Sequence, residues 1–217
     1  LNYIKEKYGV VANLTVSDQF SIDNYQVWGQ PWEVPYYPSK YHTAVPASSI
    51  KDKLDVVNFQ WAPRDPINGY KNSLYSTQDY FVTGKNLDTG YFEKLVKLYL
   101  KTGKNDFGQV TVGLESDLSP ESYKGEFTKQ IGLIASLQNK KELKVLTMKD
   151  FTGWYRKLYP DLSPQYLIEA EDLLGERKKV SWYQSPYYRI GVLVDDDKKE
   201  KKIFDFRIYS KDLIDPY

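Results

Sequence analysis

Carboxylate side chains follow the ends of predicted strands in this 217-residue chain. Asp65 comes shortly after the strand predicted at 55–61, and Glu115 directly follows the strand predicted at 109–114. Two carboxylates that flank a glycosidic bond can hydrolyse it, because one protonates the leaving oxygen while the other acts as nucleophile or base. The pattern therefore predicts Glu115 and Asp65 as a catalytic pair. Arg64 would orient a substrate oxygen or tune Asp65 electrostatically.

Purely structural roles are the alternative for the same charged residues. Arg64 and Asp65 are equally compatible with a mutual ion pair, or with an Asp65 that stabilises a proline-rich turn. Asp117 is better explained as favourable negative charge at the start of the helix that follows Ser119. Glu115 is harder to explain in this way, because it directly follows the apolar run VTVGL and a buried carboxylate is costly without a partner.

Aromatic residues are frequent, since 20 Tyr, 9 Phe and 5 Trp make up 16% of the chain. Tyr and Trp offer flat, half-polar rings that suit sugar rings, and the alternative is that they fill the core and interfaces. The predicted sugar platform consists of aromatic residues on the loop after the first strand and at the end of the second: Trp28, Trp32, Tyr36, Tyr37 and Trp61. A glycan or polysaccharide is therefore the expected partner.

The composition argues against several other classes of protein. The net charge of +1 gives no reason to expect nucleic acid or an anionic membrane as partner. No apolar run reaches the roughly 20 residues that a membrane span needs, and the start LNYIKEKYGV lacks the apolar middle of a signal peptide. Cysteine is absent and His42 is the single histidine, so we expect no cofactor and no metal bound by this chain alone.

The elements that must position these residues alternate between strand and helix up to residue 158. The predicted order is helix 2–8 ending at Gly9, strand 10–16, strand 55–61, helix 91–101, strand 109–114, a helix from Ser119-Pro120, strand 143–147 and helix 148–158 behind a Thr147–Asp150 capping box. Buried-type strands alternating with helices favour a parallel α/β arrangement with the helices outside. In such folds ligands lie beyond the carboxyl ends of the strands.

The pattern changes after Pro160. A short helix is predicted from Ser163 to about Leu174, and the segments 179–194 and 201–210 then alternate polar and apolar residues around the charged tip DDDKKEKK. This alternation predicts a small antiparallel β appendage. We therefore expect two domains, an α/β portion at 1–160 and a C-terminal helix with the antiparallel appendage at 161–217.

Several stretches resemble polysaccharide deacetylase barrels and the related glycoside hydrolases. The run from LNYIKEKYGVVANLTV through HTAVPAS is similar to the mid-to-late part of that fold, where a helix, a glycine and a strand lead into an aromatic loop. FQWAPRDP resembles a later strand, with Pro66 where a tryptophan is usual. TVGLESD resembles the penultimate strand, with Glu115 at or beside the place of a histidine, and LKVLTMKDFTGWY resembles the closing strand and helix.

The resemblance covers residues 1–158 and implies a partial seven-stranded (β/α) barrel of carbohydrate-active type. The metal site of these enzymes requires an Asp-Asp pair and a His-x-x-x-His pair, and neither occurs here. Either the first strands lie upstream of Leu1 or this branch has lost its metal chemistry. A glycosidase that uses carboxylates, with Glu115 in place of the histidine, needs no metal.

Two other functions remain open alongside glycan hydrolysis. One is a metal-dependent deacetylase whose ligands lie outside this chain, and the other is a non-catalytic glycan-binding or cell-envelope assembly module. Four parallel strands would leave exposed sheet edges, so we expect the β appendage, an N-terminal segment, a partner chain or a second copy to cover them. The resemblance favours an extracellular or cell-envelope location.

Overall fold

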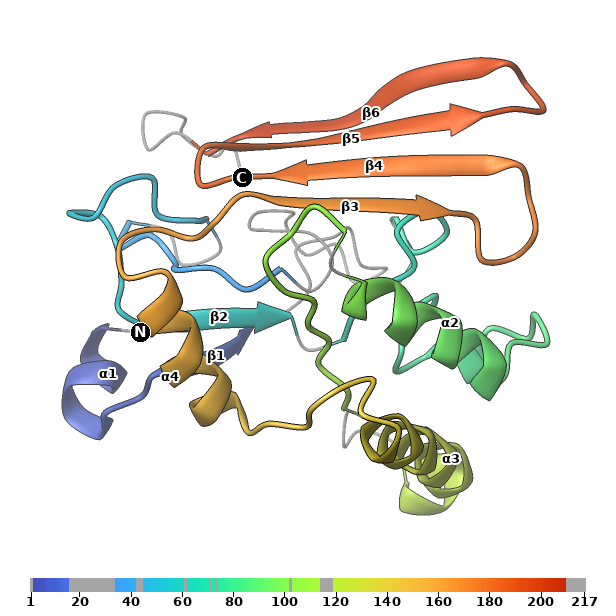
Figure 1. The fold of residues 1–217 in the computed structure, drawn as a ribbon, viewed down its shortest axis with the longest axis horizontal. Helices are drawn as coiled ribbons and strands as arrows, with labels where there is room; N and C mark the ends of the chain where they lie inside the picture. The colour runs from blue at the N-terminus through green and yellow to red at the C-terminus, as the bar shows by residue number, and fades with distance from the viewer. Residues whose placement is uncertain are drawn as a thin grey trace.

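The described part of the chain forms a mixed α/β structure with two separate sheets. The computed structural model describes residues 2–15, 34–41, 45–60, 62–70, 72, 74–101, 103–113 and 119–209. Figure 1 shows a four-stranded antiparallel sheet along the top of the molecule, with the helices and a short parallel pair of strands below it.

The parallel pair consists of β1 (Ala12–Thr15) and β2 (Val57–Gln60). The two strands run in the same direction with Ala12 opposite Val57, so a small part of the predicted parallel arrangement is confirmed. A third segment lies along the other edge of β2, because Tyr36 and Asn58 exchange backbone hydrogen bonds of 3.1 and 2.8 Å in antiparallel fashion. The described neighbours of β2 therefore come from two places in the chain, β1 and the segment around Tyr36.

The parallel sheet is smaller than the sequence predicts. Residues 107–113 and 143–147 form no regular strand, so a full barrel is not seen in the described part of the chain. Val145 and Leu146 are 54% and 40% exposed, and the backbone N–H of Val145 donates to the side chain of Gln138 at 2.9 Å. A residue type that favours strands forms one only where a neighbouring strand supplies hydrogen bonds and packing.

Local signals fix the ends of the helices. The helices are α1 (Asn2–Tyr8), α2 (Thr89–Leu100), α3 (Pro120–Asn139) and α4 (Met148–Leu158), with a short 3₁₀ helix at Tyr80–Val82. Gly9 ends α1 with φ of +66°, a conformation that glycine adopts without strain. Thr147 caps α4 by accepting the N–H of Asp150 at 3.1 Å, and its hydroxyl donates to the Asp150 carboxylate at 2.8 Å.

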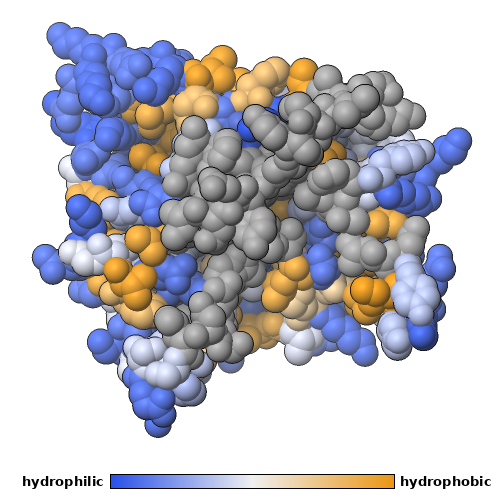
Figure 2. All heavy atoms as spheres, turned by 180° about the vertical axis from the view of Figure 1, so that it is seen from behind, coloured by the Kyte–Doolittle hydropathy of each residue, from blue (hydrophilic) through white to orange (hydrophobic). Residues whose placement is uncertain are grey.

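The second sheet is an antiparallel meander in the order β3-β4-β5-β6. Its strands are β3 (Tyr166–Glu171), β4 (Lys178–Gln184), β5 (Tyr188–Asp195) and β6 (Glu200–Ile208). The predicted antiparallel sheet and its charged turn are confirmed, and Figure 2 shows that turn as the hydrophilic upper-left corner.

The prediction of a helix from Ser163 to Leu174 is wrong, since this segment contains β3. Tyr166, Ile168 and Ala170 are buried, and the residues between them are half-buried or exposed, so the burial has a strand period of two.

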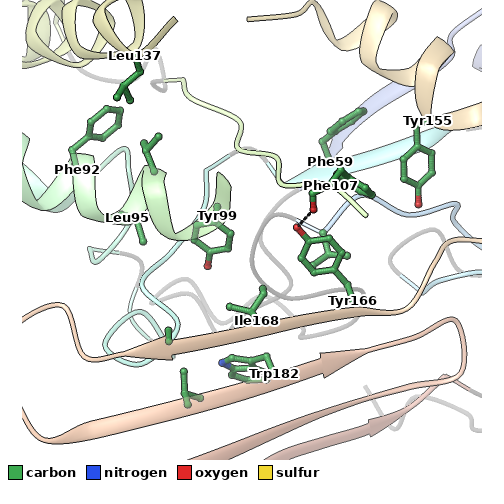
Figure 3. Close-up of a cluster of buried hydrophobic side chains, with 14 of the residues drawn as sticks. Phe59, Phe92, Leu95, Tyr99, Phe107, Leu137, Tyr155, Tyr166, Ile168 and Trp182 are labelled. Atoms are coloured by element: carbon green, nitrogen blue, oxygen red, sulfur yellow. Dashed lines mark hydrogen bonds between the residues drawn. The ribbon is translucent and has the colours of Figure 1, made fainter. Parts of the chain in front are cut away.

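A buried cluster of described side chains joins the two sheets. It contains Phe59 of β2, Leu95 of α2, Tyr155 of α4 and both Ile168 and Trp182 of the antiparallel sheet. Figure 3 shows these side chains converging between the helices and the sheet, with the Tyr166 hydroxyl donating to the carbonyl of Phe107 at 2.7 Å. The cluster contains residues from both sides of residue 160. The domain boundary near that residue stays a prediction.

Candidate functional site

The two faces of β2 differ in chemistry. Val57 and Phe59 point to the helix side, where the Phe59 ring lies 5.3 Å from the ring of Phe151 in α4. Asn58 and Gln60 point to the other face and are only 1% and 2% exposed. The segment 55–61, interpreted from sequence as a nearly continuous apolar strand, is thus apolar on one face and polar on the other.

The polar face extends to β1. Asn13 lies opposite Asn58 in the parallel register, and its side-chain amide donates to the Asn58 oxygen at 3.2 Å. Buried amides need such partners, because an unpaired polar group inside a protein is costly. Sequence reasoning missed these amides, although the alternation Val57-Asn58-Phe59-Gln60 carried the signal. The parallel pair therefore presents a row of amides leading to its carboxyl end.

The loop beyond β2 holds Asp65 in a fully buried position, with 0% exposure. One carboxylate oxygen, Oδ1, accepts the backbone N–H groups of Ile67 at 2.9 Å and Asn68 at 2.8 Å. The other oxygen accepts the hydroxyl of Tyr91 at 3.0 Å and the Asn68 side-chain amide at 3.4 Å. This geometry is the turn-stabilising role that was the alternative to catalysis.

Burial raises the pKa of Asp65 above its ordinary value of 3.8, and the hydrogen bonds from Asn68, Ile67 and Tyr91 act in the opposite direction. The turn itself is tight. A Cβ atom on Gly69 would lie 2.5 Å from the carbonyl oxygen of Asp65, so only glycine fits there without a shift of the backbone. Asp65 is thus enclosed by its own turn and by α2.

Arg64 is also buried, with 3% of its surface exposed. Its backbone forms an antiparallel bridge with Ser76, and its carbonyl accepts the Tyr99 hydroxyl at 2.6 Å. The N–H of Asp65 donates to the carbonyl of Tyr75 at 2.7 Å. These contacts fix the backbone of the loop against the segment 75–77 and against α2.

The two tyrosines expected in the sugar platform lie in the interior. Tyr36 and Tyr37 are 2% and 1% exposed. The Tyr37 hydroxyl donates to the carbonyl of Tyr159 at 2.7 Å, and burial raises the pKa of Tyr37 to about 12. A stacking sugar needs an open ring face, so the structure corrects this part of the predicted platform. Both rings serve the core.

The remaining predicted site residues lie outside the described part of the chain. These are Glu115, Trp28, Trp32 and Trp61, and His42 is outside it as well. The structure thus brings Arg64 and Asp65 to the carboxyl end of β2.

A small cavity lies at another place, between the C-terminal end of α2 and β3. It measures about 50 Å³ and is lined by residues 98, 99, 101, 103–105 and 166–169. That volume holds a few water molecules rather than a sugar ring. Among the residues that the structure describes, no three His, Asp or Glu side chains gather as a metal centre would require. None of the described helices is both long and apolar enough to cross a membrane.

These features define a mixed α/β protein whose parallel strands end in a buried polar loop. Residues 1–171 match the family described as "Domain of Unknown Function with solved-structure structure (DUF3863)", and the chain belongs to this family. No curated protein matches the chain.

A solved structure shares the fold. It is a crystal structure from Parabacteroides distasonis, described as that of a "putative glycoside hydrolase/deacetylase", with a TM-score of 0.72 and 17% sequence identity. The match covers 95% of this chain and 53% of the other, so this chain spans about half the length of that protein.

Proposed function

We propose that this chain is part of a carbohydrate-active protein that binds a glycan and hydrolyses it with strand-end carboxylates. The observation that supports the proposal best is the fold shared over 95% of the chain with a protein described as a glycoside hydrolase/deacetylase. The row of amides on β1 and β2, half-buried at Asn13 and buried at Asn58 and Gln60, leads to a loop with an acid and an arginine and is consistent with a polar site at that end.

Glu115 carries the proposed chemistry, with Asp65 as its partner and Arg64 orienting a substrate oxygen. Trp28, Trp32 and Trp61 supply the proposed stacking surface. The four hydrogen bonds that Asp65 accepts also support a different division of roles, in which Asp65 fixes the loop and Glu115 acts with another acid. A glycosidase needs its two carboxyl groups about 5 to 9.5 Å apart, and that separation is the geometric requirement on the pair.

The second candidate function is deacetylation, because the description of the matched protein names both activities. Its metal ligands would come from outside this chain. The two activities release different products: a glycosidase generates new reducing ends, whereas a deacetylase releases acetate. Both products are measurable in a single incubation with an acetylated polysaccharide.

The experiment compares Glu115→Gln and Asp65→Asn in the full-length natural protein. If Glu115 is the acid or nucleophile, Glu115→Gln abolishes reducing-end release while the unfolding midpoint stays unchanged. If Asp65 only fixes the loop, Asp65→Asn lowers stability and keeps measurable turnover. Full turnover in Glu115→Gln would refute the carboxylate mechanism, and release of acetate without reducing ends would favour deacetylation.

A further inference from the structure

The outer face of the antiparallel sheet carries aromatic and aliphatic side chains at one end. The inner face is defined by buried residues such as Ile168, Val180 and Trp182, which pack into the core. Side chains alternate along each strand, so the residues between these face outward. The register aligns Tyr183, Ile190 and Phe206 in one row across β4, β5 and β6.

A second outward pair, Tyr188 and Ile208, lies next to this row. The ring of Tyr188 is 5.3 Å from that of Tyr183 and 6.1 Å from that of Phe206, measured between ring centres. Tyr188, Ile208 and Phe206 are 38%, 48% and 54% exposed. We call the surface made by Tyr183, Tyr188, Ile190, Phe206 and Ile208 the aromatic end of the sheet.

Charge is separated from the aromatic end. The outward side chains at the other end of the sheet include Glu169, Glu171, Lys179 and Lys201, with Lys179 and Glu171 forming an ion pair at 3.3 Å.

The arginines near the aromatic end belong to the opposite face of the sheet. Arg189 and Arg207 both approach the inward carboxylate of Asp205. The polar group beside the rings is neutral, since the Tyr183 hydroxyl donates to the Gln165 side chain at 3.0 Å. The described residues of the aromatic end therefore offer rings, hydroxyls and an amide without charge.

We propose that the aromatic end binds a neutral polysaccharide chain, as a binding surface separate from the strand-end site. Neighbouring rings on a sheet suit the apolar faces of consecutive sugar units, and the tyrosine hydroxyls and Gln165 suit their hydroxyl groups. Among the described residues of this end no outward side chain is charged, which matches an uncharged ligand, whereas an acidic glycan would call for cations. The proposal rests on the proposed function for its ligand class. It adds that binding does not depend on Glu115.

The two sites lie on opposite sides of the sheet. The inner face packs through Trp182 onto the loop after β2, where the indole N–H donates to the carbonyl of Pro66 at 2.9 Å. The aromatic end faces away from that loop. Substitutions of its exposed rings therefore leave the core contacts intact, and binding can be tested apart from catalysis.

The test is native gel electrophoresis of the full-length protein through neutral polysaccharides, namely xylan, mixed-linkage β-glucan, galactomannan and amylose, with hyaluronan as an acidic comparison. The double variant Tyr188→Ala/Phe206→Ala removes two exposed rings. Tyr3→Ala is the matched control, because Tyr3 is 65% exposed on α1. We expect retardation by a neutral polysaccharide that weakens about tenfold in the double variant. It should stay unchanged in Tyr3→Ala and in Glu115→Gln.

Equal retardation of the wild type and the double variant, retardation by hyaluronan alone, or no retardation of the wild type would each overturn the proposal. A concentration-dependent mass in analytical ultracentrifugation that the double variant lacks would assign the surface to a second copy instead. If Glu115→Gln keeps both turnover and retardation, the proposed catalysis fails while the binding surface stands.

Discussion

The two sheets of this protein bury polar groups in different ways. In the antiparallel sheet, Arg189 and Asp205 form an ion pair of 2.8 Å with 0% and 3% of their side chains exposed. In the loop after the parallel strands, the contacts that hold the Asp65 carboxylate come from amide and hydroxyl donors. The buried carboxylate of Asp205 is thus neutralised by a cation, whereas the buried carboxylate of Asp65 is stabilised by neutral hydrogen-bond donors.

The sheets also differ in how far apart in sequence their partners lie. β4, β5 and β6 pair through short turns, whereas Ala12 of β1 pairs with Val57, so β1 and β2 depend on a long intervening segment. Contacts between residues distant in sequence require more loop closure than hairpins do. We infer that residues close in sequence determine the strand pairing of the antiparallel sheet, while the pairing of β1 with β2 depends on the folding of segments distant in sequence.

The largest expected effect comes from Trp182→Ala, because Trp182 is a large buried contact between the two regions. Its ring lies 4.8 Å from Phe204 and 5.8 Å from Tyr70, and its N–H binds the loop after β2. Loss of this buried side chain should lower the free energy of unfolding by about 4 kcal/mol. Trp154→Ala, at a 41% exposed position, should cost clearly less.

Urea unfolding followed by circular dichroism measures both tryptophan variants. If the two sheets share one core, Trp182→Ala keeps a single transition at lower urea. Two separated transitions would show that the regions unfold independently and would favour the predicted boundary near residue 160.

Removing the buried anion should have the next largest effect. Asp205→Asn leaves the guanidinium of Arg189 buried without its carboxylate, which should cost about 3 kcal/mol. Arg189→Met/Asp205→Leu removes both charges and should recover most of that loss. If the double variant is no more stable than Asp205→Asn in urea unfolding, the pair contributes through its shape rather than its charge.

Asp65→Asn tests the dipolar solvation of the other carboxylate. Burial raises the pKa of Asp65, so the folded state holds its proton more strongly than the unfolded state. The stability contributed by this group is therefore full below the ordinary value of 3.8 and is lost as pH rises through the folded pKa.

At about pH 3 the Asn variant should be less stable by about 1 kcal/mol, because the Tyr91 hydroxyl loses its acceptor. The difference in unfolding free energy between the wild type and the variant should narrow toward about pH 7 in urea unfolding, since the amide cannot ionise. If the difference in unfolding free energy widens as the pH rises, the folded state favours the ionised carboxylate, and the expected upward shift of the Asp65 pKa is refuted.

The smallest effect concerns two helix starts that look alike in sequence. Thr147 makes a side-chain cap on α4, whereas Ser119 makes no side-chain cap on α3. Thr147→Ala should cost about 1 kcal/mol, and Ser119→Ala should change the unfolding free energy very little. Equal losses in thermal unfolding would show that the Ser119 hydroxyl caps the helix in solution.

The sequence predicted elements correctly where the determining residues are neighbours in the chain. It failed where a strand needs a partner that is distant in sequence. The end of α1 at Gly9 and the whole of α4 behind Thr147 follow from backbone conformation and capping. The segments 109–113 and 143–147 have strand-like residues but lack a paired strand in the structure. The helix predicted at 163–174 was wrong because a serine-proline start outweighed the period-two burial of β3.

For the candidate site, the sequence located Arg64 and Asp65 at the end of a strand, and it raised the turn-stabilising alternative for Asp65. It did not reveal that Tyr36 and Tyr37 are buried, because the residue type alone does not distinguish a tyrosine that binds a sugar from a tyrosine in the core. Exposure depends on which segments pack above the ring.

The sequence by itself determined the end of α1 at Gly9, the start of α4 behind Thr147, the alternating pattern of β4 to β6 and the charged turn between β5 and β6. Each of these depends on residues within a few positions of one another, through hydrogen bonds and dihedral preferences. Only the tertiary structure decided which apolar runs become strands, which tyrosines face inward and whether Asp65 meets solvent. Those outcomes depend on contacts between segments distant in sequence, such as β1 with β2 and Trp182 with Pro66. A local sequence pattern does not predict such contacts.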